Sequence, residues 1–383
     1  MKIIDTRQVQ EIGSFGAKDD ARKMGSSFFR GEHCNFNPYR EDRADPDFLE
    51  NYIGKGWAPS QPIIDKSTRI TAFGSCFAEN ISAYLSAKGY ALTRNDEPEI
   101  YVSRIGEGLV NTYAILQQFE WAWLGKRYAN DLWHGWKGES FDYDEEIRLK
   151  TKAAFERTDL FIITLGLSEI WYDSETSEVF WRAIPIKAYN PDRHKFRVAT
   201  AAENSANILR IIDLIAEFRP SAKVLITVSP IPLAATFRPV AALTANAVSK
   251  SNLRAGVDEA FTQRESDIGK RLFYFPSYEI VHEFPFRFEG DSRHVHAYIL
   301  DANMRIFEAF YCAGDVTKVD ANRVFQAALL RNLTEAPQEL ATALAKNLAE
   351  GPAVNAAFDL SMATKRKRAR GLTGLIASAF IKS

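Results

Sequence analysis

Residues 69–85 constrain the fold more than any other stretch, because a short apolar run there passes through Gly74, Ser75 and Cys76 straight into a helical pattern. A turn of small residues between a strand and a helix places a nucleophilic side chain at the carboxyl edge of a sheet and at the amino end of a helix. Both Ser75 and Cys76 are candidates. The alternative is structural, because serine and cysteine also serve as helix caps and as small buried residues.

Buried strands and helices alternate along the rest of the chain. Consecutive apolar residues predict strands, and apolar residues at helical spacing predict the helices between them. The expected strands are 158–166, 224–229 and 272–276, and the expected helices are 78–88, 109–124, 201–218 and 239–264. This alternation is typical of an α/β fold with three layers, built on a doubly wound, mostly parallel sheet of the flavodoxin-like kind.

The chain is expected to have three regions. Residues 1–67 are rich in charge, glycine and proline and predict an extended arm that lies on the core through scattered aromatic residues. Residues 68–312 form the α/β domain, and residues 313–383 form a helical extension that ends in a basic cluster, 365–370, and a short apolar stretch. That tail is either a weak contact for an anionic membrane surface or a solvated helix with a charged face.

Composition excludes several classes of function. The net charge of −1 over 383 residues argues against nucleic acid as a partner. Three cysteines without a CxxC pair argue against a disulfide framework and structural zinc, and the adjacent His33 and Cys34 have no further ligands at metal spacing. We expect no metal or cofactor. The N-terminus carries no long apolar run and no stretch reaches the roughly 18 apolar residues of a spanning helix, so a cytoplasmic protein is expected.

Polar residues follow each expected strand, where ligands bind in open α/β sheets. Gly166, Ser168 and Glu169 follow the second strand, and a serine and two prolines at 229–232 follow the third. Late in the chain, Asp291 and His294 lie three residues apart. Each pattern alone is weak, and a solvated surface turn is the alternative for the last of them.

Together these blocks have the order of those in the SGNH (GDSL-like) hydrolases, which the chain resembles. Residues 74–78 also spell GSCFA, the motif that names the GSCFA family, and further likenesses to that family lie at 132–134, 164–171, 228–230 and 274–280. The resemblance covers about residues 68–312. It implies an esterase or acyltransferase that acts on a small-molecule or carbohydrate ester through an acyl-enzyme. A different function is a non-catalytic α/β module that binds a glycan or a partner.

The resemblance also implies roles for individual residues. Aligning Gly74–Ala78 without gaps on the GDSL block puts Cys76 at the nucleophile position and leaves Ser75 as the rival, and a thiol at a helix N-terminus is a competent nucleophile. His294 would be the general base and Asp291 would orient its ring, with His296 as the alternative base.

The implied oxyanion and substrate-binding residues are less regular. By resemblance the oxyanion donors are the backbone N–H at the nucleophile, a glycine of the second block and an Asn side chain of the third. Gly106 or Gly108 would fill the second role. After Gly166, Ser168 and Glu169 stand where the superfamily has Asn and Asp. Ser168 could equally be a helix cap. His134 lies in an aromatic-rich loop, where it either lines the pocket or packs among the aromatic rings.

Overall fold

The computed structural model describes residues 14–15, 22–23, 35, 37–38, 41–105, 108–128, 132–135, 137–284, 293–334 and 342. The chain divides into two compact units, Met1–Arg331 and Asn332–Ser383, and the central sheet belongs to the first. Across these ranges, none of the helices combines the length and the apolar character that crossing a membrane requires.

The centre of the first unit is a four-stranded parallel sheet with the order β3-β4-β7-β8. The described strands are β1 (Ser14–Phe15), β2 (Arg22–Lys23), β3 (Ile70–Gly74), β4 (Leu160–Leu165), β5 (Glu169–Asp173), β6 (His194–Val198), β7 (Lys223–Val228) and β8 (Leu272–Tyr274). Every residue of β4 is buried, as its unbroken apolar sequence predicts for a strand covered on both faces. The three strands expected after the first are confirmed as β4, β7 and β8.

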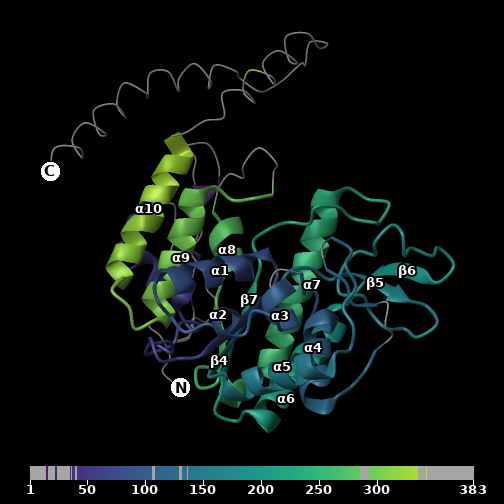
Figure 1. Cartoon of the computed structure of the whole chain (residues 1–383). Coiled ribbons are helices and arrows are strands. Elements are labelled where there is room, and N and C mark those ends of the chain that lie inside the picture. The colour runs from purple at the N-terminus through teal and green to yellow at the C-terminus, as the bar shows by residue number, and fades with distance from the viewer. Residues whose placement is uncertain are drawn as a thin grey trace, which may run out of the picture. The chain divides into compact units, whose positions relative to one another are not determined.

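Helices cover both faces of this sheet (Figure 1). They are α1 (Cys76–Ala87), α2 (Thr93–Asp96), α3 (Tyr101–Ile105), α4 (Thr112–Leu124), α5 (Glu145–Arg157), α6 (Ala201–Phe218), α7 (Ala242–Thr262), α8 (Ser277–His282), α9 (Ala297–Tyr311) and α10 (Lys318–Thr334), with the short turns η1 (Glu41–Ala44), η2 (Glu50–Gly54) and η4 (Glu265–Asp267). Side chains of α3 to α7 build the core on one face, and side chains of α1, α8, α9 and α10 build the core on the other. The protein therefore has the expected α/β fold with three layers.

The sheet reverses its direction of winding at β3. After α1 the chain returns to the outer edge of β3, where Leu92 pairs in parallel with Ile70 and the Ile70 N–H donates to the Ala91 carbonyl at 2.9 Å. The later strands β4, β7 and β8 all follow on the opposite side of β3. The gap between the carboxyl ends of β3 and β4 is thus a topological switch point, which is where doubly wound sheets bind ligands.

Residues between 41 and 67 also contribute to the core. Phe48, Leu49 and Ile64 are buried in the same cluster as α1 and α9, and Ile64 pairs in parallel with Cys312. This part of the expected arm is therefore held by the domain through apolar side chains. The boundary at residue 67 remains a sequence-based proposal, and most of the expected C-terminal extension, including the basic cluster 365–370, lies outside the described residues.

Candidate functional site

The turn between β3 and α1 is confirmed at the carboxyl edge of the parallel sheet. Gly74 has a φ of 137°, and a Cβ atom added there would lie 2.1 Å from the carbonyl oxygen of Thr164 on β4. The N–H of Ser75 donates to that same carbonyl at 3.0 Å. Only glycine fits this close approach, so Gly74 fixes where the next two residues stand.

Ser75 and Cys76 have different surroundings. The Ser75 side chain is buried, and its Oγ accepts a hydrogen bond from the N–H of Phe77 at 3.3 Å, as an N-cap of α1 does. Cys76 is only partly buried and occupies the first position of the helix. Ser75 therefore has the capping role that the sequence allowed, and Cys76 is the more exposed of the two.

A cavity of about 530 Å³ opens at the switch point, with Ser75 and Cys76 in its wall. Gly166 after β4 and Ser229 after β7 line it from the neighbouring strand ends, and His294 lines it from the segment before α9. Small-molecule sites in proteins are typically clefts of about 300–1,000 Å³. One cavity is thus lined by four of the residues that sequence patterns placed after separate strands: Ser75, Cys76, Gly166 and Ser229.

Of the two candidate histidines, one lines the cavity and the other does not. His294 is exposed and lines it. The ring of His296 stacks on Tyr298 with the ring centroids 5.5 Å apart, and the cavity wall as described does not include it. Cys76 and His294 therefore line the same cavity. Asp291 lies outside the described residues.

The glycines expected to supply oxyanion donors have other partners. The N–H of Gly166 donates to the carbonyl of Val110 at 2.8 Å, although the residue lines the cavity. The N–H of Gly108 donates to the carbonyl of Ile105 at 2.9 Å. These bonds occupy both amides within the protein, while Gly166 stays in the cavity wall as a candidate substrate-binding residue. Gly106 lies outside the described residues.

Ser168 does not contribute to the cavity wall, contrary to expectation. It is fully buried, its N–H donates to Oγ of Ser249 at 2.8 Å, and its own Oγ donates to the Ser249 carbonyl at 2.9 Å. Nδ2 of Asn204 donates to the same Oγ at 3.2 Å. These bonds tie the end of β4 to α6 and α7, so Ser168 serves the framework of the site.

Glu169 does line the cavity, at the start of β5. Its Oε1 accepts a hydrogen bond from Oγ1 of Thr236 at 2.7 Å, which links the hairpin to the loop after β7. Burial raises the pKa of this carboxyl above its usual value, and the Thr236 hydrogen bond opposes that rise. Glu169 therefore places a carboxyl group of reduced acidity in the cavity wall.

His134 packs behind the cavity, as one of the two sequence alternatives allows. It is buried, its Nε2 lies 2.9 Å from the carbonyl oxygen of Ala183, and its ring centroid is 6.2 Å from that of Phe180. Burial lowers the pKa of this imidazole. Ala183 and Phe180 line the cavity, whereas His134 supports them from the protein side.

Lys250 is a residue of this region that the sequence patterns did not identify. It is fully buried on α7, and its Nζ donates to the carbonyl of Gly166 at 2.6 Å and to the carbonyl of Ser229 at 2.8 Å. Burial lowers its pKa to about 7, with Cys76 acting to raise it. One signal was present: Lys250, Leu253 and Val257 share the apolar helical spacing of α7.

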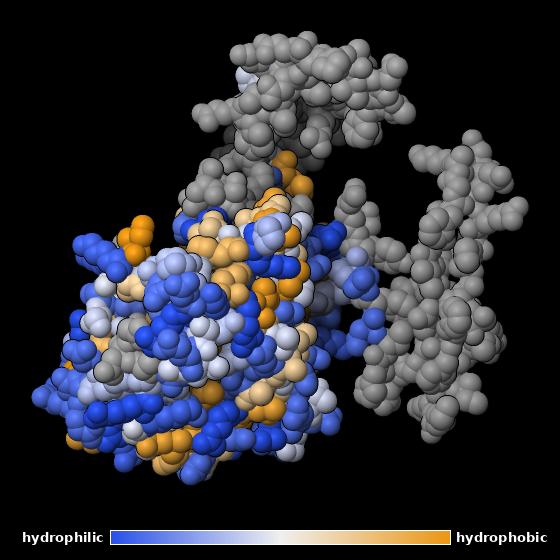
Figure 2. Space-filling model, turned by 90° about the vertical axis from the view of Figure 1, so that its right-hand side faces the viewer, coloured by the Kyte–Doolittle hydropathy of each residue, from blue (hydrophilic) through white to orange (hydrophobic). Residues whose placement is uncertain are grey.

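Three aromatic rings form one wall of the cavity. Trp171 on β5, Phe196 on β6 and Phe237 in the loop after β7 all line it. The ring centroids of Trp171 and Phe237 lie 4.9 Å apart, and those of Phe196 and Phe237 lie 5.4 Å apart. Phe237 is 55% exposed. On the side of the molecule drawn in Figure 2, hydrophilic side chains predominate and apolar ones are interspersed among them.

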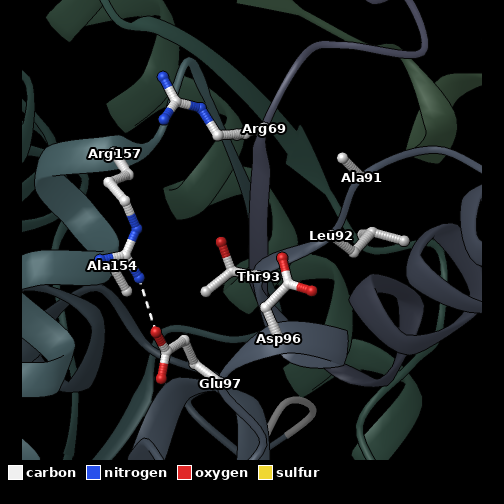
Figure 3. A pocket seen from close by; sticks show the side chains of 8 residues that line it. All are labelled: Arg69, Ala91, Leu92, Thr93, Asp96, Glu97, Ala154 and Arg157. Carbon is white, nitrogen blue, oxygen red and sulfur yellow. Dashed lines mark hydrogen bonds and ion pairs between the residues drawn. The ribbon is translucent and has the colours of Figure 1, made fainter.

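A second hollow lies near the start of β3, beside Arg69 and Leu92, and Figure 3 shows its lining. Its volume is about 30 Å³, and Nη2 of Arg157 bonds Oε1 of Glu97 at 2.6 Å beside it. That volume is about what one water molecule occupies in the liquid. The ligand-sized site is therefore the one at the carboxyl edge of the sheet.

Among the residues that the structure describes, no group of three His, Cys, Asp or Glu side chains converges as metal ligands would.

Comparison with known proteins identifies one protein family whose sequence model matches this chain. The sequence model of the GSCFA family matches residues 69–307, and no curated protein matches the chain. Among solved structures, an acetyl xylan esterase (Est2A) from the rumen bacterium Butyrivibrio proteoclasticus is similar at 11% sequence identity and a TM-score of 0.26. That similarity covers 76% of this chain and 66% of the esterase, slightly less than two thirds of its length. The family match extends over more than half of the sequence and includes every strand of the parallel sheet, and the chain therefore belongs to the GSCFA family.

Proposed function

We propose that this protein is an acyl-transferring enzyme, an esterase or O-acyltransferase, that works through a thioester on Cys76 with His294 as the general base. The observation that carries the proposal is that the accessible thiol and the exposed imidazole line the same 530 Å³ cavity. The rival hydroxyl of Ser75 caps α1 instead. A nucleophile and a base in one ligand-sized cleft are the minimum for covalent acyl transfer.

The reaction requires two steps. The Cys76 sulfur bonds to the carbonyl carbon of the ester as His294 accepts the thiol proton, and the carbonyl electron pair moves onto oxygen. Collapse of this intermediate breaks the bond to the alcohol oxygen, which takes the proton from His294. Water or an acceptor hydroxyl then attacks the thioester, and His294 carries its proton to the departing sulfur. Asp291 remains the proposed orienting residue for His294, on sequence grounds alone.

The oxyanion needs a donor, and the N-terminus of α1 provides the best one. Cys76 is the first residue of the helix, so its N–H lies at the helix N-terminus, beside the proposed nucleophile. The helix dipole favours negative charge at the same place. The resemblance to the SGNH hydrolases implies this same backbone donor at the nucleophile, whereas the Gly108 amide is bonded to the Ile105 carbonyl.

The cavity wall supports an ester with an apolar or ring-bearing group as substrate. Trp171, Phe196 and Phe237 offer ring faces against which an acyl chain or the apolar face of a sugar could pack. Acylated carbohydrate therefore remains one candidate within the proposed substrate class.

Replacing Phe237 by alanine is expected to raise KM for a p-nitrophenyl ester about fivefold to tenfold and to change kcat little, since a partly exposed ring contributes binding rather than chemistry. Steady-state kinetics with acetyl, butyryl and octanoyl esters would measure this. Leu243→Ala is the matched control, because Leu243 is 80% exposed and the cavity wall as described does not include it. Equal effects of the two substitutions would contradict the assignment of the aromatic wall.

Trapping the acyl-enzyme tests the proposed function itself. The wild-type protein is mixed with p-nitrophenyl acetate, quenched in acid and digested, and the cysteine peptides are examined by mass spectrometry. One acetyl group on the Cys76 peptide, together with release of nitrophenol, is the expected result. Cys312 is the internal control, because it is buried and burial raises the pKa of its thiol to about 12. Absence of both acylation and turnover would instead favour a cavity that binds its ligand without chemistry.

A further inference from the structure

Lys250 joins two strand ends that line the cavity of the proposed nucleophile. Gly166 follows β4 and Ser229 follows β7, and the carbonyls of both accept hydrogen bonds from Lys250 Nζ at 2.6 and 2.8 Å. Both residues also line the cavity with Cys76. The ammonium group therefore lies directly behind the cavity wall, although it comes from α7, far away in sequence.

A fully buried ammonium group is costly. Two carbonyl oxygens replace only part of the hydration that the charge loses, so a buried lysine normally has a partner of opposite charge or becomes neutral. Among the residues that the structure describes, three ionisable groups interact electrostatically with Lys250: Cys76 on α1, His282 on α8 and Arg293 before α9. Arg293 and His282 carry positive or no charge, whereas the Cys76 thiolate is negative. Cys76 is thus the one of these three that can balance the ammonium.

We propose that Lys250 is a positioning residue for the reactive thiol: its ammonium fixes the ends of β4 and β7 and favours the thiolate form of Cys76. The inference rests on the proposed function, because it assigns the group that activates the nucleophile named there. A purely structural role would need only the two hydrogen bonds. The electrostatic role needs the charge, and this difference can be measured.

Two electrostatic interactions of Lys250 fit this arrangement. The interaction between Lys250 and Cys76 raises the pKa of the lysine, against the lowering caused by burial and by Arg293. Lys250 in turn contributes to the lowered pKa of His282, after the larger effect of burial, and Nε2 of His282 lies 2.8 Å from the carbonyl oxygen of Pro230 in the loop after β7. Because electrostatic coupling is reciprocal, an ammonium that is stabilised by a thiolate stabilises that thiolate equally.

The test compares alkylation of Cys76 by iodoacetamide across pH 5.5 to 10 in the wild type and in Lys250→Gln, with labelling quantified on the Cys76 peptide. Glutamine keeps amide donors for the carbonyls and removes the charge. The pH midpoint of the alkylation rate should rise by about one unit, and the rate at pH 7 should fall about tenfold. Lys270→Gln is the matched control, because it removes the same charge from an exposed site near the amino edge of the sheet. Lys250→Met, which removes donors and charge together, should shift the midpoint at least as far.

A folded Lys250→Gln protein with the wild-type pH profile would overturn the proposal and leave Lys250 a structural residue. If neither Lys250 variant folds, an NMR titration of lysine-labelled protein decides instead, because it leaves Lys250 in place. The titration midpoint of Lys250 should fall in Cys76→Ala, and an unchanged midpoint would overturn the proposal. Neither measurement requires turnover. A protein that shows the coupling but no acyl-enzyme would therefore refute the proposed function and not the coupling.

Discussion

Replacing Cys76 by alanine is expected to lower ester turnover by at least about 1,000-fold, since loss of a covalent nucleophile removes the acyl-enzyme route altogether. The fold should survive, because Cys76 is partly exposed at the first position of α1 and alanine is a good helix former. Initial rates with p-nitrophenyl acetate and a urea unfolding curve would measure the two effects separately.

Ser75→Ala is the matched control and should show the opposite pattern. It removes the hydrogen bond from the Phe77 N–H to Ser75 Oγ, so it should cost about 1 kcal/mol of unfolding free energy as a lost N-cap does. Turnover should stay within about tenfold of the wild type, because the hydroxyl takes no part in the proposed chemistry. The reverse order of damage to turnover would move the nucleophile to Ser75.

Much of the fold could be predicted because its signals are local. The strands β4 and β7 are unbroken apolar runs, and α6 matches the expected 201–218 because Thr200 and Glu203 form a capping box at its start. The predicted start of a helix was wrong where a capping side chain sets it. The helix expected from residue 109 begins at Thr112, since Asn111 Oδ1 accepts the Ala114 N–H at 2.8 Å as an N-cap.

The strands β5 and β6 were not predicted. They pair as an antiparallel hairpin that carries Glu169, Trp171 and Phe196 to the cavity. Their sequences mix charged and aromatic residues and are joined by a long connection, so neither an apolar run nor a short turn signals them. The aromatic wall of the site was missed for that reason.

At the site, too, local sequence patterns predicted some residues and missed others. Residues directly after predicted strands, Cys76 and Gly166, do meet at the cavity, because parallel strands deliver their carboxyl ends to one edge. Side-chain direction could not be predicted, and Ser168 therefore turned out to bond Ser249 inside the protein. Lys250 reaches the site from the middle of α7, so its role depends on tertiary packing that no local pattern records.

Gly74→Ala adds a single methyl group, and we expect it to destabilise the fold more than the same addition elsewhere near this site. At a φ of 137° an L-residue is strained, and the added Cβ would lie 2.1 Å from the Thr164 carbonyl oxygen, which itself accepts the Ser75 N–H. Since β3 and β4 are hydrogen-bonded neighbours, relief requires the sheet to open at the switch point. We expect a loss of more than about 3 kcal/mol of unfolding free energy, measured by urea denaturation, or no folded protein.

Gly89→Ala separates backbone strain from this steric clash. Gly89 also has a positive φ, of 76°, but an added Cβ there meets no atom within 4 Å. Its substitution should therefore cost only about 1 kcal/mol, the price of the left-handed conformation alone. The difference between the two variants measures how tightly the β3–α1 turn is pressed against β4. If Gly74→Ala cost no more than Gly89→Ala, the turn could shift freely, and the rigid placement of Cys76 on which the proposed chemistry depends would be lost with it.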